Sequence, residues 1–297
     1  MRDAVKLGLG SAQFGLDYGV SNREGMTSED EVRRILGLAS GRGVKVIDTA
    51  RAYGRSQEVL GRCLPPAHGF DIVTKIAPMR TASISRDQLA GLAAQFEQSL
   101  TMLRQERVYG LLAHHAGDVL AEGGEGVVDA LRALQARGLV NKIGVSVYDA
   151  RELDCVLARW TPDIVQLPLS VLDQRLIASG HVAQIARLGV EIHVRSVFLQ
   201  GLLLMAPQAI PAPLQGAARG VAEFQAFAAA GGCSPAGAAL QFAAALPGVR
   251  AVLAGVNNAA QLEELLDYGS CAADTFAMAR FALTDEALLN PARWRLQ

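Results

Sequence analysis

The sequence predicts an α/β fold in which eight parallel strands form a (β/α)8 barrel. Short apolar runs alternate with amphipathic stretches about eight times along the 297 residues. Polar or ionisable residues close most of these runs, as they do at the functional face of a barrel. The chain is 51% hydrophobic and 19% charged, which is typical of a well-buried globular protein. We therefore expect a single domain over residues 1–297.

The predicted strands are short and rich in Val, Ile and Leu, as strands buried on both faces are. A doubly wound sheet is the structural alternative, but it needs fewer strands and usually an early glycine-rich dinucleotide fingerprint. Residues 7–15 contain glycines at the wrong spacing for that fingerprint. The eight runs are residues 5–10, 44–48, 72–75, 108–114, 142–146, 164–166, 190–195 and 249–255.

Helices are predicted between these strands by capping signals and apolar stripes. The pattern from Ser28 to Glu31 is a capping box ahead of an apolar periodicity, and the pattern from Asp149 to Glu152 starts another helix. A stripe of apolar residues within 127–139 has Gly138 near its end, which is typical of a helix terminus.

An irregular segment follows the seventh predicted strand. Residues 199–220 contain three prolines and several glycines. A loop of this length in a compact domain is usually functional or disordered. We expect this segment to lie over the barrel mouth as a lid on a long cofactor.

Composition argues against several classes of partner. The net charge is −1, so the protein lacks the basic field that binds a nucleic-acid backbone. Only 5% of residues are aromatic, which gives few side chains on which bases could stack. No uncharged apolar run approaches the roughly 20 residues that span a bilayer. The four cysteines are scattered without metal-ligand spacing, which predicts unpaired thiols in a reducing compartment and no metal site. We therefore expect a cytoplasmic protein without nucleic-acid or membrane partners.

Seven predicted strands end in residues suited to chemistry or ligand binding. The carboxyl ends of parallel strands meet at one face of a barrel, so we expect these side chains to gather there. Any one of them could be an ordinary strand-end residue, but their repetition favours the barrel. They are Asp48, Lys75, His114, Ser146, Gln166, Arg195 and Gly255.

Four residues near this face together have the groups needed to protonate a carbonyl oxygen while a hydride reaches its carbon. The unperturbed pKa of tyrosine is about 10, and we expect the ammonium of Lys75 to lower the pKa of Tyr53. Asp48 would hold Lys75, and His114 would donate a hydrogen bond to the same oxygen. Taken singly, they could be a helix cap, a solvated lysine, a packing tyrosine and a structural histidine.

Residues 48–61, DTARAYGRSQEVLG, together with Lys75 and His114, resemble the aldo-keto reductase superfamily, and the resemblance extends over residues 8–266. It implies a (β/α)8 barrel, a nicotinamide cofactor and a catalytic tetrad of Asp48, Tyr53, Lys75 and His114. The family pattern of strand, histidine and aromatic residue selects His114 over the adjacent His115. The implied activity is reduction of an aldehyde or ketone, with Tyr53 as general acid or base.

The same resemblance implies the cofactor site. Ser146 and Gln166 would bind the nicotinamide carboxamide, although Val147 replaces the usual Asn. Arg195 stands where many relatives have an aromatic ring. The remaining implied cofactor residues are Gly10, Ser11, Ser196, Phe198, Gly201, Gly255, Asn257, Asn258, Gln261 and Glu264.

The resemblance favours NADP(H) but leaves NAD(H) open. Relatives that prefer NADPH often carry Lys or Arg at the position of Asn257 or Asn258, to bind the 2′-phosphate. Neutral amides are weaker partners for a dianion. Leu265 also replaces an Asn that contacts adenine in relatives.

The expected substrate is a small carbonyl compound or a sugar, and the expected assembly is a monomer or small homo-oligomer. Phe14, Tyr18 and Asn22 in the first loop and Trp294 near the C-terminus are candidate pocket residues, or packing residues. An NAD-dependent sugar dehydrogenase is the first alternative function. A nicotinamide-binding regulatory protein with little turnover, and an unrelated barrel lyase or isomerase, are the others.

Overall fold

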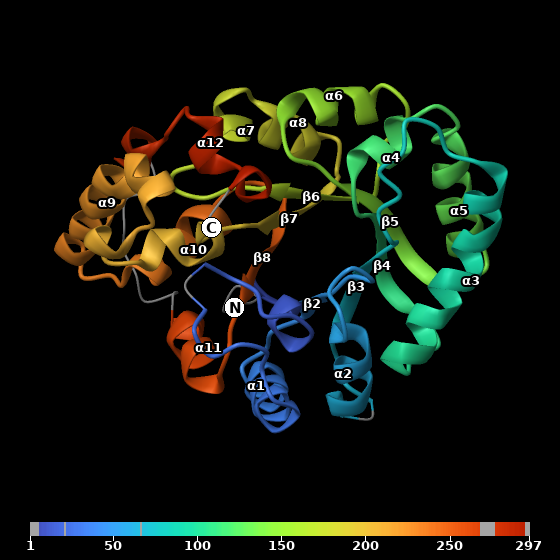
Figure 1. Cartoon of the computed structure of the whole chain (residues 1–297), viewed down its shortest axis with the longest axis horizontal. Coiled ribbons are helices and arrows are strands. Elements are labelled where there is room, and N and C mark those ends of the chain that lie inside the picture. Colours follow the sequence, from blue (N-terminus) through green and yellow to red (C-terminus); the bar gives the residue numbers. More distant parts are fainter. Residues whose placement is uncertain (1–5, 21, 66, 268–276, 295–297) are drawn as a thin grey trace.

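Eight parallel strands close into a barrel in sequence order, which confirms the predicted fold (Figure 1). The computed structural model describes residues 6–20, 22–65, 67–267 and 277–294. Each strand pairs with the next, and β1 pairs with β8 to close the sheet, with Leu9 opposite Ala254. The strands are β1 (Leu7–Gly10), β2 (Val46–Asp48), β3 (Asp71–Lys75), β4 (Val108–Ala113), β5 (Val140–Ser146), β6 (Ile164–Pro168), β7 (Glu191–Arg195) and β8 (Val249–Gly255).

Helices surround the barrel, with α1 and α2 below, α3 and α5 to the right and α9 to the left in Figure 1. No helix in the described part of the chain combines the length and apolar character needed to cross a bilayer. The helices are α1 (Glu29–Gly41), α2 (Ser56–Cys63), α3 (Arg86–Leu103), α4 (Ala116–Leu120), α5 (Glu125–Ala136), α6 (Ala150–Leu157), α7 (Arg175–Ala178), α8 (His181–Arg187), α9 (Ala218–Ala230), α10 (Pro235–Ala244), α11 (Ala259–Leu266) and α12 (Glu286–Leu289).

The two predicted helix caps are present, but the glutamate side chains three residues later do not bond back to the cap residues. Ser28 caps α1 by accepting from the amide of Glu31, and Asp149 caps α6 in the same way through Glu152. A capping box would return the glutamate side chain to the cap residue. Instead, Glu31 accepts a bond from Ala259 at the start of α11. One half of that predicted box is therefore a contact between two helices distant in sequence.

The barrel interior is filled by side chains from strands on opposite sides of the barrel as well as from neighbouring ones. Val46, Val73, Leu112, Ile164, Ala251 and Leu253 form a cluster of their own, separate from the core between strands and helices. Residues on β2 and β6 can meet only through the barrel axis. This packed layer closes the barrel, so a ligand site can lie only at its end.

The segment after β7 is more ordered than expected. It contains three short 3₁₀ turns, at Leu199–Leu204, Pro207–Ala209 and Ala212–Ala217, and then enters α9. Of these, only the first turn contributes residues to the cavity at the barrel mouth. The prediction of a lid over the whole segment is therefore wrong for the later turns, which pack against α9.

The prediction of unpaired cysteines holds for two residues and fails for a third. Cys63 and Cys155 are free thiols. Cys233 is disulfide-bonded. Cys271 lies outside the described residues.

Candidate active site

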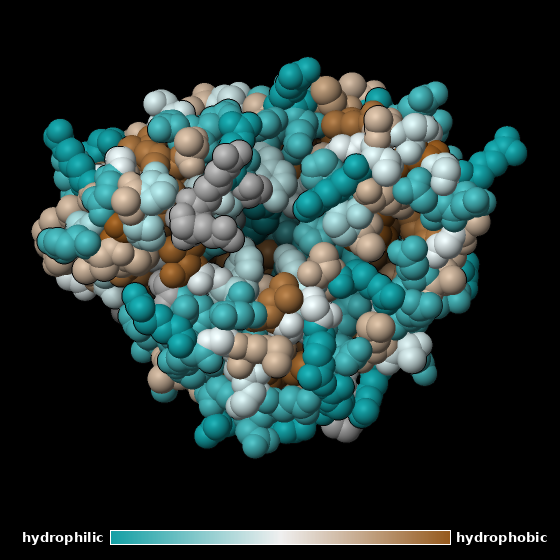
Figure 2. Space-filling model, viewed as in Figure 1, coloured by the Kyte–Doolittle hydropathy of each residue, from teal (hydrophilic) through white to brown (hydrophobic). Residues whose placement is uncertain are grey.

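A cavity of about 700 Å³ opens at the carboxyl ends of the strands. Figure 2 shows a central hollow on this face, with mainly hydrophilic residues and a few hydrophobic ones around it. All but two of the predicted site residues line the cavity. These lining residues are Asp48, Tyr53, His114, Gly10, Ser11, Ser146, Gln166, Arg195, Ser196, Phe198, Gly201, Gly255, Asn257, Gln261 and Glu264.

Asp48 and Lys75 form a buried ion pair at the floor of the cavity. The Lys75 Nζ lies 2.7 Å from both carboxylate oxygens of Asp48 and 3.0 Å from the carbonyl oxygen of Thr49. The Lys75 side chain is 1% exposed, which explains why it does not line the cavity. Each charge is compensated by the other, since an isolated buried charge would be costly. The pair forms because β2 and β3 are adjacent and both end at this face.

Tyr53 reaches the ion pair from a tight turn between β2 and α2. Its hydroxyl lies 3.4 Å from Lys75 Nζ, and the ammonium is 5.0 Å from the ring centre. The next residue, Gly54, has φ of +53°, where a side chain would be strained. A Cβ on Gly15 would lie 2.1 Å from the Tyr53 carbonyl oxygen, so the first loop presses directly on this turn. Two glycines thus allow the backbone approach that places Tyr53.

The pKa of Tyr53 is raised, so the expectation of a more acidic phenol is wrong for the structure described. Burial is the largest cause, and the carboxylate of Asp48 adds to it. The ammonium does not offset this burial as expected, because much of its charge is compensated by the two oxygens of Asp48. The pKa of Lys75 is itself lowered, chiefly by burial. Tyr53 is accordingly a neutral phenol that holds its proton.

His114 follows β4 and faces Tyr53 across the cavity. The two rings meet edge to face, with centres 5.7 Å apart. Burial first, and then the charges of Lys75 and Arg195, lower the pKa of His114 to about 3. The imidazole is therefore neutral at physiological pH and can donate from one nitrogen only. The neighbouring His115 stands at the N-cap of α4 and does not line the cavity, as the predicted register requires.

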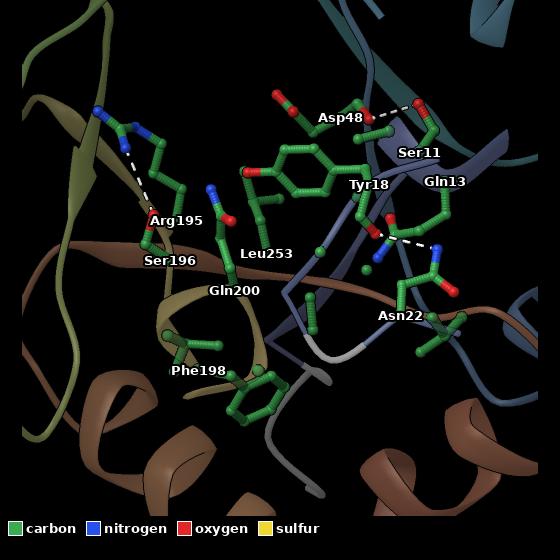
Figure 3. Close-up of a pocket in the computed structure, with 18 of the residues that line it drawn as sticks. Ser11, Gln13, Tyr18, Asn22, Asp48, Arg195, Ser196, Phe198, Gln200 and Leu253 are labelled. Atoms are coloured by element: carbon green, nitrogen blue, oxygen red, sulfur yellow. Dashed lines mark hydrogen bonds between the residues drawn. The ribbon is translucent and has the colours of Figure 1, made fainter. Parts of the chain in front are cut away.

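Gln166 and Ser11 both brace Asp48. The Gln166 amide nitrogen donates to Asp48 Oδ1 at 2.7 Å, which fixes the amide and leaves its oxygen as the acceptor for a ligand. Ser11 donates to the Asp48 carbonyl oxygen at 2.9 Å (Figure 3) and contacts Ser56 Oγ at 2.7 Å. The Ser11 hydroxyl thus holds β1, β2 and α2 together, a role that the sequence did not suggest.

Arg195 extends from β7 over an aromatic ring. Its guanidinium carbon lies 4.3 Å from the ring centre of Tyr148. It donates to the carbonyl oxygen of Val147 and, as Figure 3 shows, to Ser196 Oγ. A planar guanidinium suits such stacking. Arg195 is thereby held at the cavity wall, and Tyr148, which was not predicted as a site residue, is its support.

The turn after β7 has unusual backbone geometry. Ser196, Leu199 and Gln200 have positive φ although none is glycine, and Gly201 has φ of +95°. Such conformations persist where surrounding structure enforces them and concentrate at ligand sites. The Gln200 carbonyl oxygen accepts a bond from the Val20 amide, and Figure 3 shows the Tyr18 hydroxyl pointing toward the Gln200 side chain. The loops after β1 and β7 therefore meet at the cavity.

The first loop and the C-terminal segment separate into pocket and packing residues. Tyr18 and Asn22 line the cavity. Phe14 is fully buried in the core and is a packing residue. Trp294 packs against the core, whereas nearby Pro291 reaches the cavity. Gln13 and Gln200, which no sequence signal marked, also line it.

The start of α11 lies at another part of the cavity wall. Asn257, Gln261 and Glu264 line the cavity. Asn258 does not, and it caps α11 by accepting from the amide of Gln261 at 3.0 Å. Asn258 is predicted as a cofactor residue, but in the structure its side chain caps α11 and does not line the cavity.

The donors and acceptors around the cavity fit a nicotinamide dinucleotide. An orphaned polar atom, His114 Nδ1, is buried beside the cavity, and the fixed amide of Gln166 and the Ser146 hydroxyl lie on its wall. The volume is within the range of small-molecule and cofactor sites. The wall extends from Tyr53 and His114 to α11, which gives room for a ligand with two parts.

Comparison with known proteins identifies the family of the chain. The chain matches the Aldo/keto reductase family model over residues 6–284. No curated protein sequence matches significantly. PA4992 of Pseudomonas aeruginosa, a proposed aldo-keto reductase, is 25% identical with a TM-score of 0.65, and 92% of this chain and 89% of that one are covered.

Two further structures share the fold. The aldo-keto reductase AKR11C1 from Bacillus halodurans, in its holo form, is 18% identical with a TM-score of 0.74, covering 95% of both chains. The glycerol dehydrogenase AKR11B4 from Gluconobacter oxydans is 20% identical with a TM-score of 0.74, covering 96% of this chain and 92% of that one. The chain belongs to the aldo/keto reductase family of oxidoreductases.

Proposed function

We propose that this protein reduces an aldehyde or ketone to an alcohol with a nicotinamide cofactor, and that Tyr53 is the general acid. The observation that carries this proposal is the position of one neutral phenol. Tyr53 lines the cavity, 3.4 Å from a buried ammonium and edge to face with a neutral imidazole. The reduced nicotinamide, when bound, supplies the hydride.

The residues around Tyr53 divide the remaining work. Tyr53 gives its proton to the carbonyl oxygen as negative charge develops there. Lys75 then stabilises the phenolate, because its ammonium is already positioned and is held by Asp48. His114, neutral because of its lowered pKa, donates a hydrogen bond that orients the carbonyl.

The cofactor roles implied by the family resemblance are supported by the places of these residues on the wall. Ser146 and Gln166 would hold the carboxamide, with Gln166 already fixed by Asp48. Arg195, Ser196, Phe198 and Gly201 would hold the ring and pyrophosphate, together with the backbone at Gly10 and Gly255. Asn257, Gln261 and Glu264 would contact the adenosine half.

The protonated state of Tyr53 at neutral pH suits the reductive direction. A neutral phenol is ready to donate a proton, whereas oxidation of an alcohol needs the phenolate at the start of the step. A sugar dehydrogenase would therefore work best at alkaline pH. The regulatory alternative requires little turnover. The set of Asp48, Lys75, Tyr53 and His114 is complete, which argues for turnover.

The test is a matched pair of variants that each remove one hydroxyl. Tyr53→Phe is expected to lower kcat/KM for aldehyde reduction by about 10² to 10⁴, whereas Tyr109→Phe, at the opposite end of the barrel, should leave it within twofold. Rates are measured with NADH and NADPH separately against a panel of aldehydes and ketones. Equal rates for wild type and Tyr53→Phe would contradict the mechanism. An absence of turnover with every carbonyl, despite tight nicotinamide binding, would favour the regulatory alternative.

A further inference from the structure

We infer that Glu31, a residue of α1, makes this protein select NAD(H) over NADP(H) by placing a carboxylate at the start of α11. The inference rests on the proposed function and deepens it. It concerns the adenosine end of the cavity, where the ribose carries either a 2′-hydroxyl or a 2′-phosphate.

The adenosine end can be located from the shape of the wall. The hydride must reach a carbonyl held by Tyr53 and His114, so the nicotinamide half lies at that end. The wall then continues along the turn after β7 to Gln261 and Glu264 on α11. A second, smaller hollow of about 290 Å³ shares Asn257 with the cavity and is lined by residues 24–28, Glu31 and Asn258.

Backbone amides at a helix start usually attract a phosphate, but at α11 several are already bonded to side chains. The Ala259 amide donates to Glu31 Oε1 at 2.7 Å. The Gln261 amide donates to Asn258 Oδ1 at 3.0 Å, and the Asn257 amide donates to Gln261 Oε1 at 2.8 Å. A 2′-phosphate would have to displace these partners, one of which is an anion.

The charges at this end point the same way. Glu24 and Glu31 line the small hollow, and Glu264 lines the cavity beside it. Among the described residues that line either hollow, Arg195 is the only lysine or arginine, and it stacks on Tyr148 near the catalytic end. The neutral side chain of Asn257, which lines both hollows, donates from its Nδ2 to Asn22 Oδ1.

A ribose 2′-hydroxyl suits this arrangement, because it can donate to a carboxylate or an amide oxygen. A 2′-phosphate has no proton of that kind to offer at neutral pH and carries close to two negative charges. Glu31 is 19% exposed and its second oxygen pairs with Arg34, whose side chain is 67% exposed. Removing the charge of Glu31 would also release Arg34, so both effects would favour a 2′-phosphate.

The experiment measures fragment binding, which needs no turnover. Isothermal titration of the full chain with 5′-AMP and with 2′,5′-ADP gives the preference for or against the 2′-phosphate. Wild type should bind 5′-AMP more tightly. Glu31→Gln keeps an oxygen for the Ala259 amide but removes the charge, and should improve the relative affinity for 2′,5′-ADP about three- to tenfold.

The matched control is Asp30→Asn, which removes the same charge one residue away, at a side chain that is 87% exposed and paired with Arg33. It should leave the ratio of the two affinities within twofold. Tighter binding of 2′,5′-ADP than of 5′-AMP by wild type would overturn the inference while the proposed function stands. An equal effect of Glu31→Gln on both fragments would do the same. If neither fragment and neither dinucleotide bound, the proposed function would fail as well.

Discussion

Each end of this barrel carries a carboxylate, a lysine, a tyrosine and a histidine, and the two ends use them differently. At the carboxyl end, Asp48, Tyr53 and His114 line the cavity, and Lys75 lies buried against Asp48. At the amino end, Glu191, Lys142, Tyr109 and His193 gather at the starts of the strands. There Glu191 accepts hydrogen bonds from Tyr109 at 2.8 Å and from His193 at 2.8 Å, and forms an ion pair with Arg250 at 3.0 Å.

The difference lies in what remains unsatisfied. Burial alone would raise the pKa of Glu191, but bonds from His193, Lys142 and Tyr109 outweigh it and lower the pKa to about 2. The phenol of Tyr109 is committed to this carboxylate. The phenol of Tyr53 has only the 3.4 Å contact with Lys75 and an open cavity before it. Residue types therefore do not by themselves mark a reactive site, whereas an uncommitted proton donor beside a cavity does.

The strongest way to break this comparison is to replace each lysine by methionine. Lys75→Met leaves Asp48 buried without its partner and should cost about 3–5 kcal/mol of stability and about 10² or more in kcat/KM. Lys142→Met should cost below about 1 kcal/mol, because Lys142 is 37% exposed, and leave activity unchanged. Chemical denaturation and steady-state rates give both values.

A double variant sharpens that result. Asp48→Asn with Lys75→Met removes both buried charges, so it should regain much of the lost stability but none of the activity. Recovery of activity in the double variant would show that Lys75 serves only to neutralise Asp48.

The amino-end cluster should determine part of the acid stability. Because the pKa of Glu191 is lower in the folded state, its stabilisation is complete above about pH 4.5 and is lost as pH falls toward 2. The loss should reach about 3 kcal/mol. Glu191→Gln should be less stable at pH 7 and show a flatter decline across this window. Urea unfolding at several pH values tests this, and an unchanged slope would contradict it.

Tyr109→Phe should lower stability without touching activity. It removes a hydrogen bond to a buried carboxylate, for which about 1.5–3 kcal/mol is typical. Tyr53→Phe should have the opposite profile, with stability nearly unchanged and activity lost. Thermal unfolding and steady-state rates of both variants measure these opposite losses of stability and activity. A large stability loss in Tyr53→Phe would mean that the Tyr53 hydroxyl is also structural.

The smallest expected effect is a flat pH profile for carbonyl reduction. The pKa of His114 is lowered to about 3 and the pKa of Tyr53 is raised, so neither group titrates between about pH 5 and 9. The value of kcat/KM should vary less than about twofold over this range. A fall in kcat/KM as pH rises through about 6.5 would show that His114 acts as an imidazolium instead.

Local pattern was enough to predict the fold and the strand-end residues at the cavity, whereas the family resemblance supplied the other wall residues. Apolar runs closed by polar residues determine the strand ends, because the carboxyl ends of parallel strands meet at one face. Asp48, Lys75 and His114 could be predicted for that reason, and Ser28 and Asp149 could be predicted as caps because capping depends on neighbours in sequence.

Only the tertiary structure decided which polar atoms are committed. The sequence suggested an acidic Tyr53, but the pairing of Lys75 with both oxygens of Asp48 and the burial of the phenol raise its pKa. Ser11 is tied to Asp48, and Glu31 reaches across to α11. Those bonds join residues 37 and 228 positions apart. Hydrogen bonds and desolvation act over a few ångströms of space, so no local sequence pattern encodes them.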